Sequence, residues 1–237
     1  MSKKPPNSQV AQNQYGRYCI PVSSSHRPAA RIVLQGGIYE PETIKFMTEH
    51  CGKGDIVHAG TYFGDFLPAI SSAASGTAKV WAFEPNSENF RCAEMTLELN
   101  GIKNVALENA GLGERPEKLT MVTADQHGRG LGGASRLEIY DPAQNFGGKE
   151  IVKIVTIDEQ VPSNRNVSIV QLDIEGHELK ALRGGLKTIA RCRPILILEV
   201  WPEADIVGNA WFSENILSLG YQASGMLHEN AVFRCPS

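Results

Sequence analysis

The sequence predicts an α/β fold in which helices cover both faces of a mostly parallel sheet. From residue 55 onward, short apolar segments alternate with segments whose apolar residues recur at helical spacing. Several apolar segments are continuous rather than alternating, which is typical of strands buried on both faces. Gly60 directly follows the first of them, where a strand would turn into a helix.

The expected elements of the first half are each bounded by recognisable residues. In chain order they are a short strand at 31–34, a helix at 41–50, a strand at 55–60, a helix at 64–75, a strand at 79–85, a helix capped by Ser87, and a strand at 104–111. Pro41 suits a first helical turn, and Gly52 follows its end. Phe90, Ala93 and Leu97 recur at helical spacing in the later helix.

The second half continues the alternation after an irregular middle. The expected elements are strands at 118–122 and 154–157, a strand at 168–175 that leads into a helix at 177–190, a strand at 194–201, a helix near 210–219, and closing strands at 221–227 and 230–235. The polar pair Glu229 and Asn230 predicts a short turn, so the closing strands should be antiparallel. The glycine cluster at 128–133 is either a lid or a disordered insertion.

Composition and charge exclude several classes of protein. Hydrophobic residues make up 42% of the 237 residues and charged residues 21%, which argues against a largely disordered chain. No apolar segment approaches the ~18 residues that predict a membrane span. The net charge of −3 offers no basic surface for non-specific nucleic-acid binding. Five cysteines without a CxxC pair favour free thiols and a cytoplasmic location.

The chain is expected to form one domain preceded by a tail. The first residues are rich in Lys, Pro, Asn, Ser and Gln and lack the apolar core of a signal peptide. We therefore expect a loosely ordered tail over residues 1–28. Residues 29–237 show neither an internal repeat nor a linker, and they are numerous enough to bury a core without disulfides.

Three features at the expected strand ends indicate a cofactor site. Ligands of open α/β sheets bind at the carboxyl ends of strands. The first feature is the turn that contains His58, Ala59, Gly60, Thr61, Tyr62 and Gly64. The second is Glu84, 24 residues after Gly60, whose carboxylate could accept both ribose hydroxyls. The third is the pair Asn109 and Ala110, placed to face an adenine edge.

The phosphate fingerprint separates two classes of cofactor. A glycine turn followed by an acid occurs both in NAD enzymes and in methyltransferases. The turn after the strand at 55–60 does not have the GxGxxG spacing that receives a pyrophosphate. This turn therefore favours S-adenosylmethionine over NAD. The structural alternative is that Gly60 and Gly64 form only a tight turn and that Glu84 is a solvated strand end.

Several segments of the sequence resemble the FkbM family of methyltransferases. They are IYEP (38–41), GDIVHAGTYFGD (54–65), VWAFEPNSENF (80–90), LELNGIKNV (97–105), ENAGLG (108–113), VTIDE (155–159), VQLDIEGHELKALRGG (170–185) and RPILILEV (193–200). The resemblance covers about residues 38–201 and implies a class I, Rossmann-like enzyme with a seven-stranded sheet. It also implies that residues 29–237 form an FkbM-like methyltransferase domain, most characterised members of which methylate hydroxyl oxygens of sugars or polyketide-type metabolites.

The first motif departs from the family pattern D-x-G-A-N-x-G. His58 replaces the Asp, Thr61 the Ala and Tyr62 the Asn, while Asp65 after the second glycine is kept. In the family, the Asp helps to orient the ammonium group of the cofactor. A neutral imidazole can accept a hydrogen bond from that group, so we expect cofactor binding to weaken as the pH falls through the ordinary histidine range, near about 6.5.

Asp173, Glu175 and His177 form the candidate catalytic group. Methyl transfer needs a positioned nucleophile and removal of its proton. We expect Asp173 to lie nearest the methionine end of the cofactor, and Glu175 or His177 to act as the base in the acceptor pocket. The alternative for His177 is a solvent-facing residue at a helix start. Glu199, at the end of an apolar strand, could reach the same pocket.

A metal-assisted mechanism is the alternative to a general base. Carboxylates at adjacent strand ends could bind magnesium or calcium, but no segment has recognisable metal-ligand spacing. We therefore favour a base without a metal.

The sequence thus predicts a cytoplasmic S-adenosylmethionine-dependent O-methyltransferase that acts on a hydroxyl of a small-molecule metabolite or sugar. We expect neither nucleic acid nor a membrane as a partner. The alternatives are an NAD-dependent oxidoreductase and a catalytically silent cofactor-binding or scaffold protein. The oligomeric state stays open, with a homodimer as one option.

Overall fold

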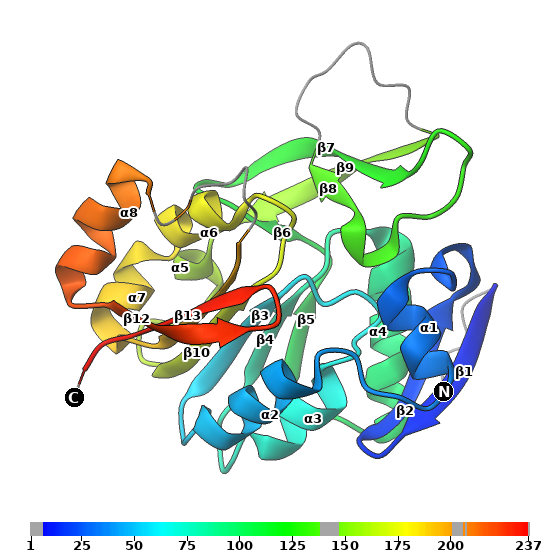
Figure 1. Ribbon diagram of the computed structural model, residues 1–237, viewed down its shortest axis with the longest axis horizontal. Helices are drawn as coiled ribbons and strands as arrows, with labels where there is room; N and C mark the ends of the chain where they lie inside the picture. Colours follow the sequence, from blue (N-terminus) through cyan, green and yellow to red (C-terminus); the bar gives the residue numbers. More distant parts are fainter. Residues whose placement is uncertain (1–6, 138–146, 201–205, 207, 237) are drawn as a thin grey trace.

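A seven-stranded sheet forms the centre of the molecule (Figure 1). The computed structural model describes residues 7–137, 147–200, 206 and 208–236. The strand order is β12-β13-β11-β10-β3-β4-β5. The parallel part consists of β3 (Asp55–Ala59), β4 (Val80–Phe83), β5 (Val105–Glu108), β10 (Val167–Leu172) and β11 (Ile195–Glu199). β12 (Gln222–Leu227) and β13 (Asn230–Arg234) form the expected antiparallel end. The predicted α/β fold class is confirmed.

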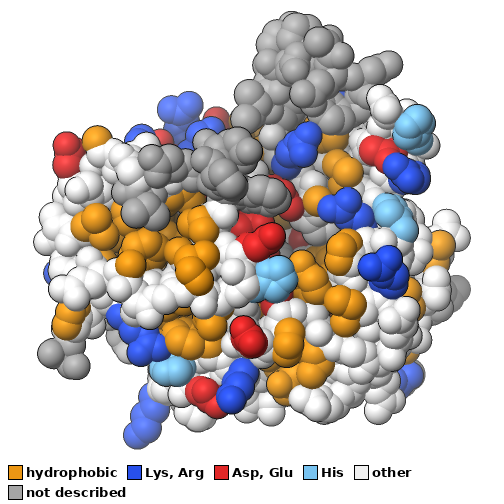
Figure 2. All heavy atoms as spheres, viewed as in Figure 1, with side chains coloured by type: hydrophobic (Ala, Val, Ile, Leu, Met, Phe, Trp, Pro, Cys, Tyr) orange, Lys and Arg blue, Asp and Glu red, His pale blue; other side chains and the backbone are white. Residues whose placement is uncertain are grey.

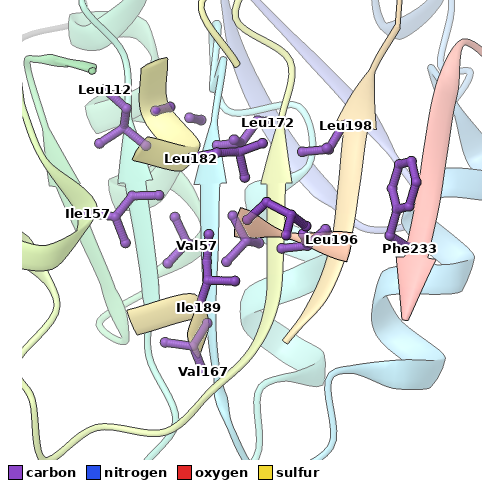
Figure 3. Close-up of a cluster of buried hydrophobic side chains, with 14 of the residues drawn as sticks. Val57, Leu112, Ile157, Val167, Leu172, Leu182, Ile189, Leu196, Leu198 and Phe233 are labelled. Carbon is purple, nitrogen blue, oxygen red and sulfur yellow. The ribbon is translucent and has the colours of Figure 1, made fainter. Parts of the chain in front are cut away.

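Helices cover both faces of this sheet. One face carries α2 (Pro41–His50) and α3 (Leu67–Ala73), and the other carries α5 (Ile157–Gln160), α6 (Glu178–Gly184), α7 (Leu186–Cys192) and α8 (Ala210–Asn215). Successive strand residues point to opposite faces. In β11, for example, Leu196 and Leu198 pack with Leu182 and Ile189 on the second face, whereas Ile197 joins the first. Figure 3 shows the core of the second face. Burial on both sides explains the continuous apolar runs.

A smaller sheet and an N-terminal hairpin flank the central sheet. The smaller sheet has the order β6-β9-β7-β8 and contains β6 (Gly111–Leu112), β7 (Glu117–Ala124), β8 (Arg136–Leu137) and β9 (Gly148–Val155). The hairpin consists of β1 (Ser8–Asn13) and β2 (Gly16–Pro21). It packs on α4 (Ser87–Asn100), with α1 (Pro28–Leu34) alongside. Short 3-10 turns lie at η1 (Val22–Ser24), η2 (Gly132–Ala134) and η3 (Leu217–Leu219).

The structure differs from the expected loose tail over residues 1–28. Residues 8–21 form the hairpin, and Tyr18, Cys19 and Ile20 are fully buried. Their burial against Phe63 and Cys92 supplies the hydrophobic free energy that orders the hairpin. Residues 1–6 lie outside the described part of the chain.

Two further local expectations are wrong. Residues 31–34 belong to α1 rather than to a strand, because Pro28 begins a helix that buries Ala29, Ala30 and Val33. Helix α4 is capped by Asn86 rather than by Ser87, since the Asn86 side chain accepts hydrogen bonds from two backbone N–H groups of the first turn. In the described ranges, no helix has the length and apolar character needed to cross a membrane.

Candidate functional site

Two cavities meet at the carboxyl ends of the central strands. The larger has a volume of about 200 Å³ and the narrower about 30 Å³. Gly60 after β3, Asp173 after β10 and Gly133 line both of them. Acidic side chains also gather near the centre of the face in Figure 2. The two cavities therefore occupy the edge of the sheet at which open α/β folds bind ligands.

The larger cavity is strongly acidic. Its walls carry the carboxyl groups of Glu40, Asp65, Asp173, Glu175, Glu199 and Glu229. Arg27 is the one lysine or arginine among the described residues of its lining. The Asp173 and Glu199 side chains share a hydrogen bond, so one of them carries a proton. Burial, and then the charge of Glu199, raise the pKa of Asp173.

Neighbouring carboxyl groups in this cavity are perturbed in the same direction. Burial raises the pKa of Asp65 to about 7. Burial, followed by the charges of Glu199 and Glu178, also raises the pKa of Glu175 to about 7. The pKa of Glu40 is raised by burial as well, although Thr43 donates a hydrogen bond to it. The cavity thus holds acids that retain protons near neutral pH.

Three residues of the larger cavity have backbone conformations that L-amino acids rarely adopt. Glu40, Tyr62 and Glu175 have φ angles of 45°, 51° and 55°, and all three line the cavity. Such strain concentrates at functional sites because the surrounding structure must hold it. Asn tolerates this region better than Tyr, so the φ of Tyr62 costs more than it would cost an asparagine.

His58 is buried in the wall of the larger cavity and is neutral. Burial lowers its pKa to about 4. Its Nδ1 lies 2.5 Å from Oε1 of Gln171, which accepts a hydrogen bond from it, and its Nε2 has no hydrogen-bond partner. The lone pair on Nε2 is thus available to a ligand. With this pKa, the expected loss of cofactor affinity near pH 6.5 moves down to about pH 4.

The structure separates the members of the candidate catalytic group. Asp173 lines both cavities and Glu175 lines the larger one, but His177 lines only the narrower one. His177 is buried rather than solvent-facing, its Nε2 has no partner, and burial lowers its pKa to about 4. Glu178 uses Oε1 to accept hydrogen bonds from Ile174 N and Gly176 N, which fixes the turn between β10 and α6.

The narrower cavity combines apolar walls with two carboxyl groups. Phe83, Leu112, Met121 and Ile174 supply the apolar surface, and Glu84 and Asp173 supply the carboxyls. Glu84 accepts hydrogen bonds from Tyr62 N at 2.7 Å and from Asn86 N at 2.8 Å. Burial nevertheless raises its pKa to about 8. Glu84 is therefore a buried group that ties the glycine turn to the start of α4, not a solvated strand end.

The other predicted cofactor residues have mainly structural contacts. Asn109 donates to the backbone oxygens of Glu84 and Pro85, and Ala110 is buried in the core. Gly111 and Leu112, rather than these two, line the narrower cavity. Ala59 lines the narrower cavity, whereas Thr61 and Gly64 are not among the described residues that line either cavity. Gly64 has a φ of 84°, so it completes the tight turn.

Glycine at two positions permits close backbone contacts. A Cβ at Gly60 would overlap the carbonyl oxygen of Asp173, and a Cβ at Gly184 would overlap that of Gly113. Gly60 is thus needed where the ends of β3 and β10 approach each other. Gly184 belongs to the LRGG segment and lets α6 rest against the loop after β6. These two contacts explain why the sequence has glycine at positions 60 and 184.

The glycine segment at 128–133 covers the site. Gly132 lies against the Tyr62 hydroxyl, and Asn89 Nδ2 donates to its carbonyl oxygen. The glycines of this segment have GxGxxG spacing. The segment nevertheless follows an antiparallel strand, β7, and leads into the 3-10 turn η2. It therefore lacks the strand–helix setting of a pyrophosphate cradle.

Sequence reasoning missed Glu40, Asn230 and Arg27 as cavity residues. Glu40 lies in the IYEP segment that resembles the family, which was a usable signal. Asn230 faces the site because it pairs with Glu199 across the antiparallel strands. Throughout the described ranges, no group of three or more His, Cys, Asp or Glu side chains is arranged to hold a metal ion. The preference for a base without a metal stays a prediction.

Comparisons with known proteins agree with this geometry. A search of curated proteins found no significant match. Among solved structures, the chain is similar to methyltransferase FkbM from Methylobacillus flagellatus KT, with 18% identity and a TM-score of 0.54. The match covers 77% of this chain and 43% of that one, so this chain spans less than half of the Methylobacillus protein. At this identity the likeness shows the fold.

Two further structures are similar at lower TM-scores. An S-adenosylmethionine (SAM) dependent methyltransferase from Aquifex aeolicus has 14% identity and a TM-score of 0.43 over 83% of this chain and 89% of that one. A tRNA (uracil-54, C5)-methyltransferase from Pyrococcus abyssi, in complex with S-adenosyl-L-homocysteine, has 12% identity and a TM-score of 0.48 over 96% and 44%. The family model of the methyltransferase FkbM domain matches residues 58–218 of the 237. The chain belongs to the FkbM methyltransferase domain family.

Proposed function

We propose that this protein is an S-adenosylmethionine-dependent methyltransferase that transfers the methyl group to a hydroxyl of a small-molecule metabolite or sugar. The observation that carries the proposal is the meeting of two unlike cavities at Gly60 and Asp173. One is narrow and largely apolar, and the other is wide and acidic. A cofactor and an acceptor would meet where the cavities join. We also propose that the N-terminal hairpin belongs to the same domain as residues 29–237, since both contribute to one core cluster.

The residues present fit this cofactor. Phe83, Leu112 and Ile174 offer apolar surface for the adenine, and Glu84 offers a carboxyl for the ribose. At the other end, the unpartnered Nε2 of His58 could accept a hydrogen bond from the ammonium group, beside Asp173. When bound, the cofactor supplies a methyl group already activated by its sulfonium. The protein then has only to orient the acceptor and remove a proton.

Opening of the narrower cavity is part of the proposal. A volume of about 30 Å³ accommodates roughly two water molecules, since one needs about 10–15 Å³ on this measure. An adenine ring needs a larger volume than this cavity offers. The Gly132–Gly133 stretch and Leu137 form the outer wall, and their displacement would admit the base. This assigns the glycine segment the role of a lid.

Glu175 is the best-supported base for the acceptor hydroxyl. Its carboxyl lines the acidic cavity, and a pKa of about 7 suits proton transfer near neutral pH. His177 lies in the narrower cavity, so we now assign it to the cofactor end. Asp173 lines both cavities and would orient the methionine end of the cofactor. We retain the expectation that no metal participates.

Calorimetry with the purified protein separates the candidate functions. We expect S-adenosylmethionine and S-adenosylhomocysteine to bind and NAD not to bind. Binding of NAD alone would support the oxidoreductase alternative, and binding of none of the three would support a silent scaffold. Mass spectrometry of metabolites incubated with the enzyme and cofactor then identifies the acceptor by its mass gain of one methylene. Loss of that product on adding EDTA, with recovery on adding magnesium, would contradict the metal-free mechanism.

The remaining proposals concern partners and location. The acidic cavity favours a small acceptor over nucleic acid, because a polyanion would be repelled from it. The five cysteines form no disulfide among the described residues, and on this ground we propose a reducing cytoplasm. Light scattering would establish whether the protein is a monomer or a homodimer.

A further inference from the structure

We propose that the acceptor carries a protonated amine beside its reacting hydroxyl, and that the end of the larger cavity formed by β10, β11 and β13 binds this ammonium group. The acceptor would thus be an amino sugar or an amino alcohol. The inference rests on the proposed function, because it names the substrate class of the same site. It is carried by unpartnered acceptor atoms and by an excess of carboxyl groups at one end of the cavity.

The strand order divides the site into two ends. The tips of β4, β3 and β10 carry Glu84, Gly60 and Asp173, which we assign to the cofactor. The sheet continues from β10 to β11 and β13, whose facing residues Glu199 and Asn230 lie opposite each other. This second end is the part of the cavity that the cofactor leaves for the acceptor.

Two buried acceptor atoms at this second end lack partners in the part of the chain that the structure describes. Glu199 is 7% exposed and Asn230 1% exposed, and among the described residues neither Oε2 of Glu199 nor Oδ1 of Asn230 has a hydrogen bond. The Asn230 amide is oriented, since its Nδ2 donates to Oε2 of Glu40 at 3.0 Å. Its oxygen is therefore left as an acceptor. Leaving such atoms unpaired is costly, and a ligand with several donors in one group would satisfy both. An ammonium has three.

Among the described residues around this end, carboxyl groups outnumber cationic groups. The acidic groups that face the site or act electrostatically on its carboxyls are Glu40, Asp65, Asp173, Glu175, Glu178, Glu199 and Glu229. The basic groups are Arg27, Arg136, His58 and His228, and the Tyr39 hydroxyl lies beside them. The raised pKa values of Glu40, Asp173 and Glu175 mean that protons partly replace the missing positive charge. A bound ammonium would displace them, so binding should release protons.

Matched pairs of probes test the proposal. The protein is titrated with D-glucosamine and D-glucose, and with ethanolamine and ethylene glycol, both alone and after saturation with S-adenosylhomocysteine. We expect each amine to bind at least about tenfold more tightly than its neutral partner, because charge-assisted hydrogen bonds are the stronger ones. Titrations at pH 7.5 in two buffers of different ionisation enthalpy should reveal proton release. Equal binding, preference for the neutral member, or binding of neither would overturn the proposal.

Variants locate the interaction within the cavity. Glu199→Gln should remove most of the preference for the amine, whereas Glu214→Gln, on the exposed surface of α8, should preserve it. Circular dichroism of each variant shows whether it has folded. If Glu199→Gln does not fold, Asn230→Asp provides the second test, since an added carboxylate at this position should strengthen amine binding. Cofactor titration is separate: failure of S-adenosylmethionine to bind contradicts the proposed function, whereas lost amine preference contradicts only this inference.

Discussion

Glu175 occupies a strained position that gives its carboxyl group a defined place in the acidic cavity. Its φ of 55° and that of Gly176, 91°, turn the chain sharply between β10 and α6. Alternation along an extended strand would have given Glu175 the same face as Asp173 and would have continued toward His177. The turn instead leaves Glu175 in the larger cavity and His177 in the narrower one. The role of Glu175 therefore depends on a backbone geometry that the amino-acid sequence alone does not reveal.

The first prediction tests Glu175 as the general base. A base must be ionised, and burial raises the pKa of Glu175 to about 7. We expect kcat to rise with pH through about 7 and then to level off. Glu175→Gln should lower kcat by ~10²–10⁴ with little change in cofactor affinity. Measured rates from pH 5.5 to 9, with Glu49→Gln as an exposed control, check this. A Gln variant with a wild-type rate profile would exclude Glu175 as the base.

A second residue-scale prediction concerns Glu84. Its carboxyl lines the narrower cavity and also accepts hydrogen bonds from Tyr62 N and Asn86 N. Glu84→Ala should reduce affinity for S-adenosylmethionine at least about tenfold, since loss of a buried hydrogen-bond partner costs about 1–3 kcal/mol. It should also lower the free energy of unfolding. Glu88→Ala, exposed in the first turn of α4, serves as the control. Unchanged affinity in calorimetry of the folded Glu84 variant would remove this residue from the site.

Sequence reasoning identified the parts of the site that lie in local motifs. The turn at Gly60 and the segment from Asp173 were predictable because each follows a strand end, where ligands bind. Glu40 and Asn230 were not, because they reach the cavity through the packing of α2 and through strand pairing between β11 and β13. Local periodicity contains no information about such distant neighbours.

At the scale of elements, strands and helices with strong patterns were predicted and those that depend on tertiary burial were not. The apolar run of β11 and the helical spacing in α4 are local signals. The hairpin β1–β2 has no such signal, since most of its exposed residues are polar and its fully buried apolar side chains are those of Tyr18, Cys19 and Ile20. Residues 31–34 are apolar enough for either state, and Pro28 upstream determines the helix.

The prediction at this scale concerns the contact of α6 with the loop after β6. A Cβ on Gly184 would overlap the carbonyl oxygen of Gly113, and the φ of Gly184 is not in the left-handed region, so steric overlap is the whole effect. Gly184→Ala should therefore lower the free energy of unfolding by about 1–3 kcal/mol or more. Gly133→Ala is the matched control, because its nearest contact would be an ordinary 3.4 Å from Tyr62. Equal urea midpoints for the two variants would contradict this account.

At the scale of the whole molecule, several buried ionisable groups are gathered around one site. Glu84 in the narrower cavity, Asp65 and Glu175 in the larger one, and Glu178 in α6 all have raised pKa values because of burial. The fold must therefore stabilise protonated acids, which costs free energy in the ligand-free protein at higher pH. We interpret this cost as the consequence of an acidic site whose negative charge is balanced when a cationic ligand binds.

This arrangement predicts that the ligand-free protein loses stability as the pH rises from 6.5 to 8. In the unfolded chain, Glu84 is ionised throughout that range, whereas in the folded protein its pKa is about 8; folding therefore takes up a proton, and higher pH favours unfolding. His58, whose folded pKa is about 4, opposes this trend mainly below pH 6.5, where the unfolded histidine becomes charged. The slope should reach about 1.4 kcal/mol per pH unit for each protonated acid, so Glu84 alone contributes roughly 2 kcal/mol between pH 6.5 and 8. Urea unfolding at pH 6.5, 7.25 and 8 measures it. Glu84→Gln, which cannot ionise, should reduce the slope by the share of Glu84, and Glu214→Gln should leave the slope unchanged. Stability that is constant or rises over this range would show that these acids are ionised in the folded protein.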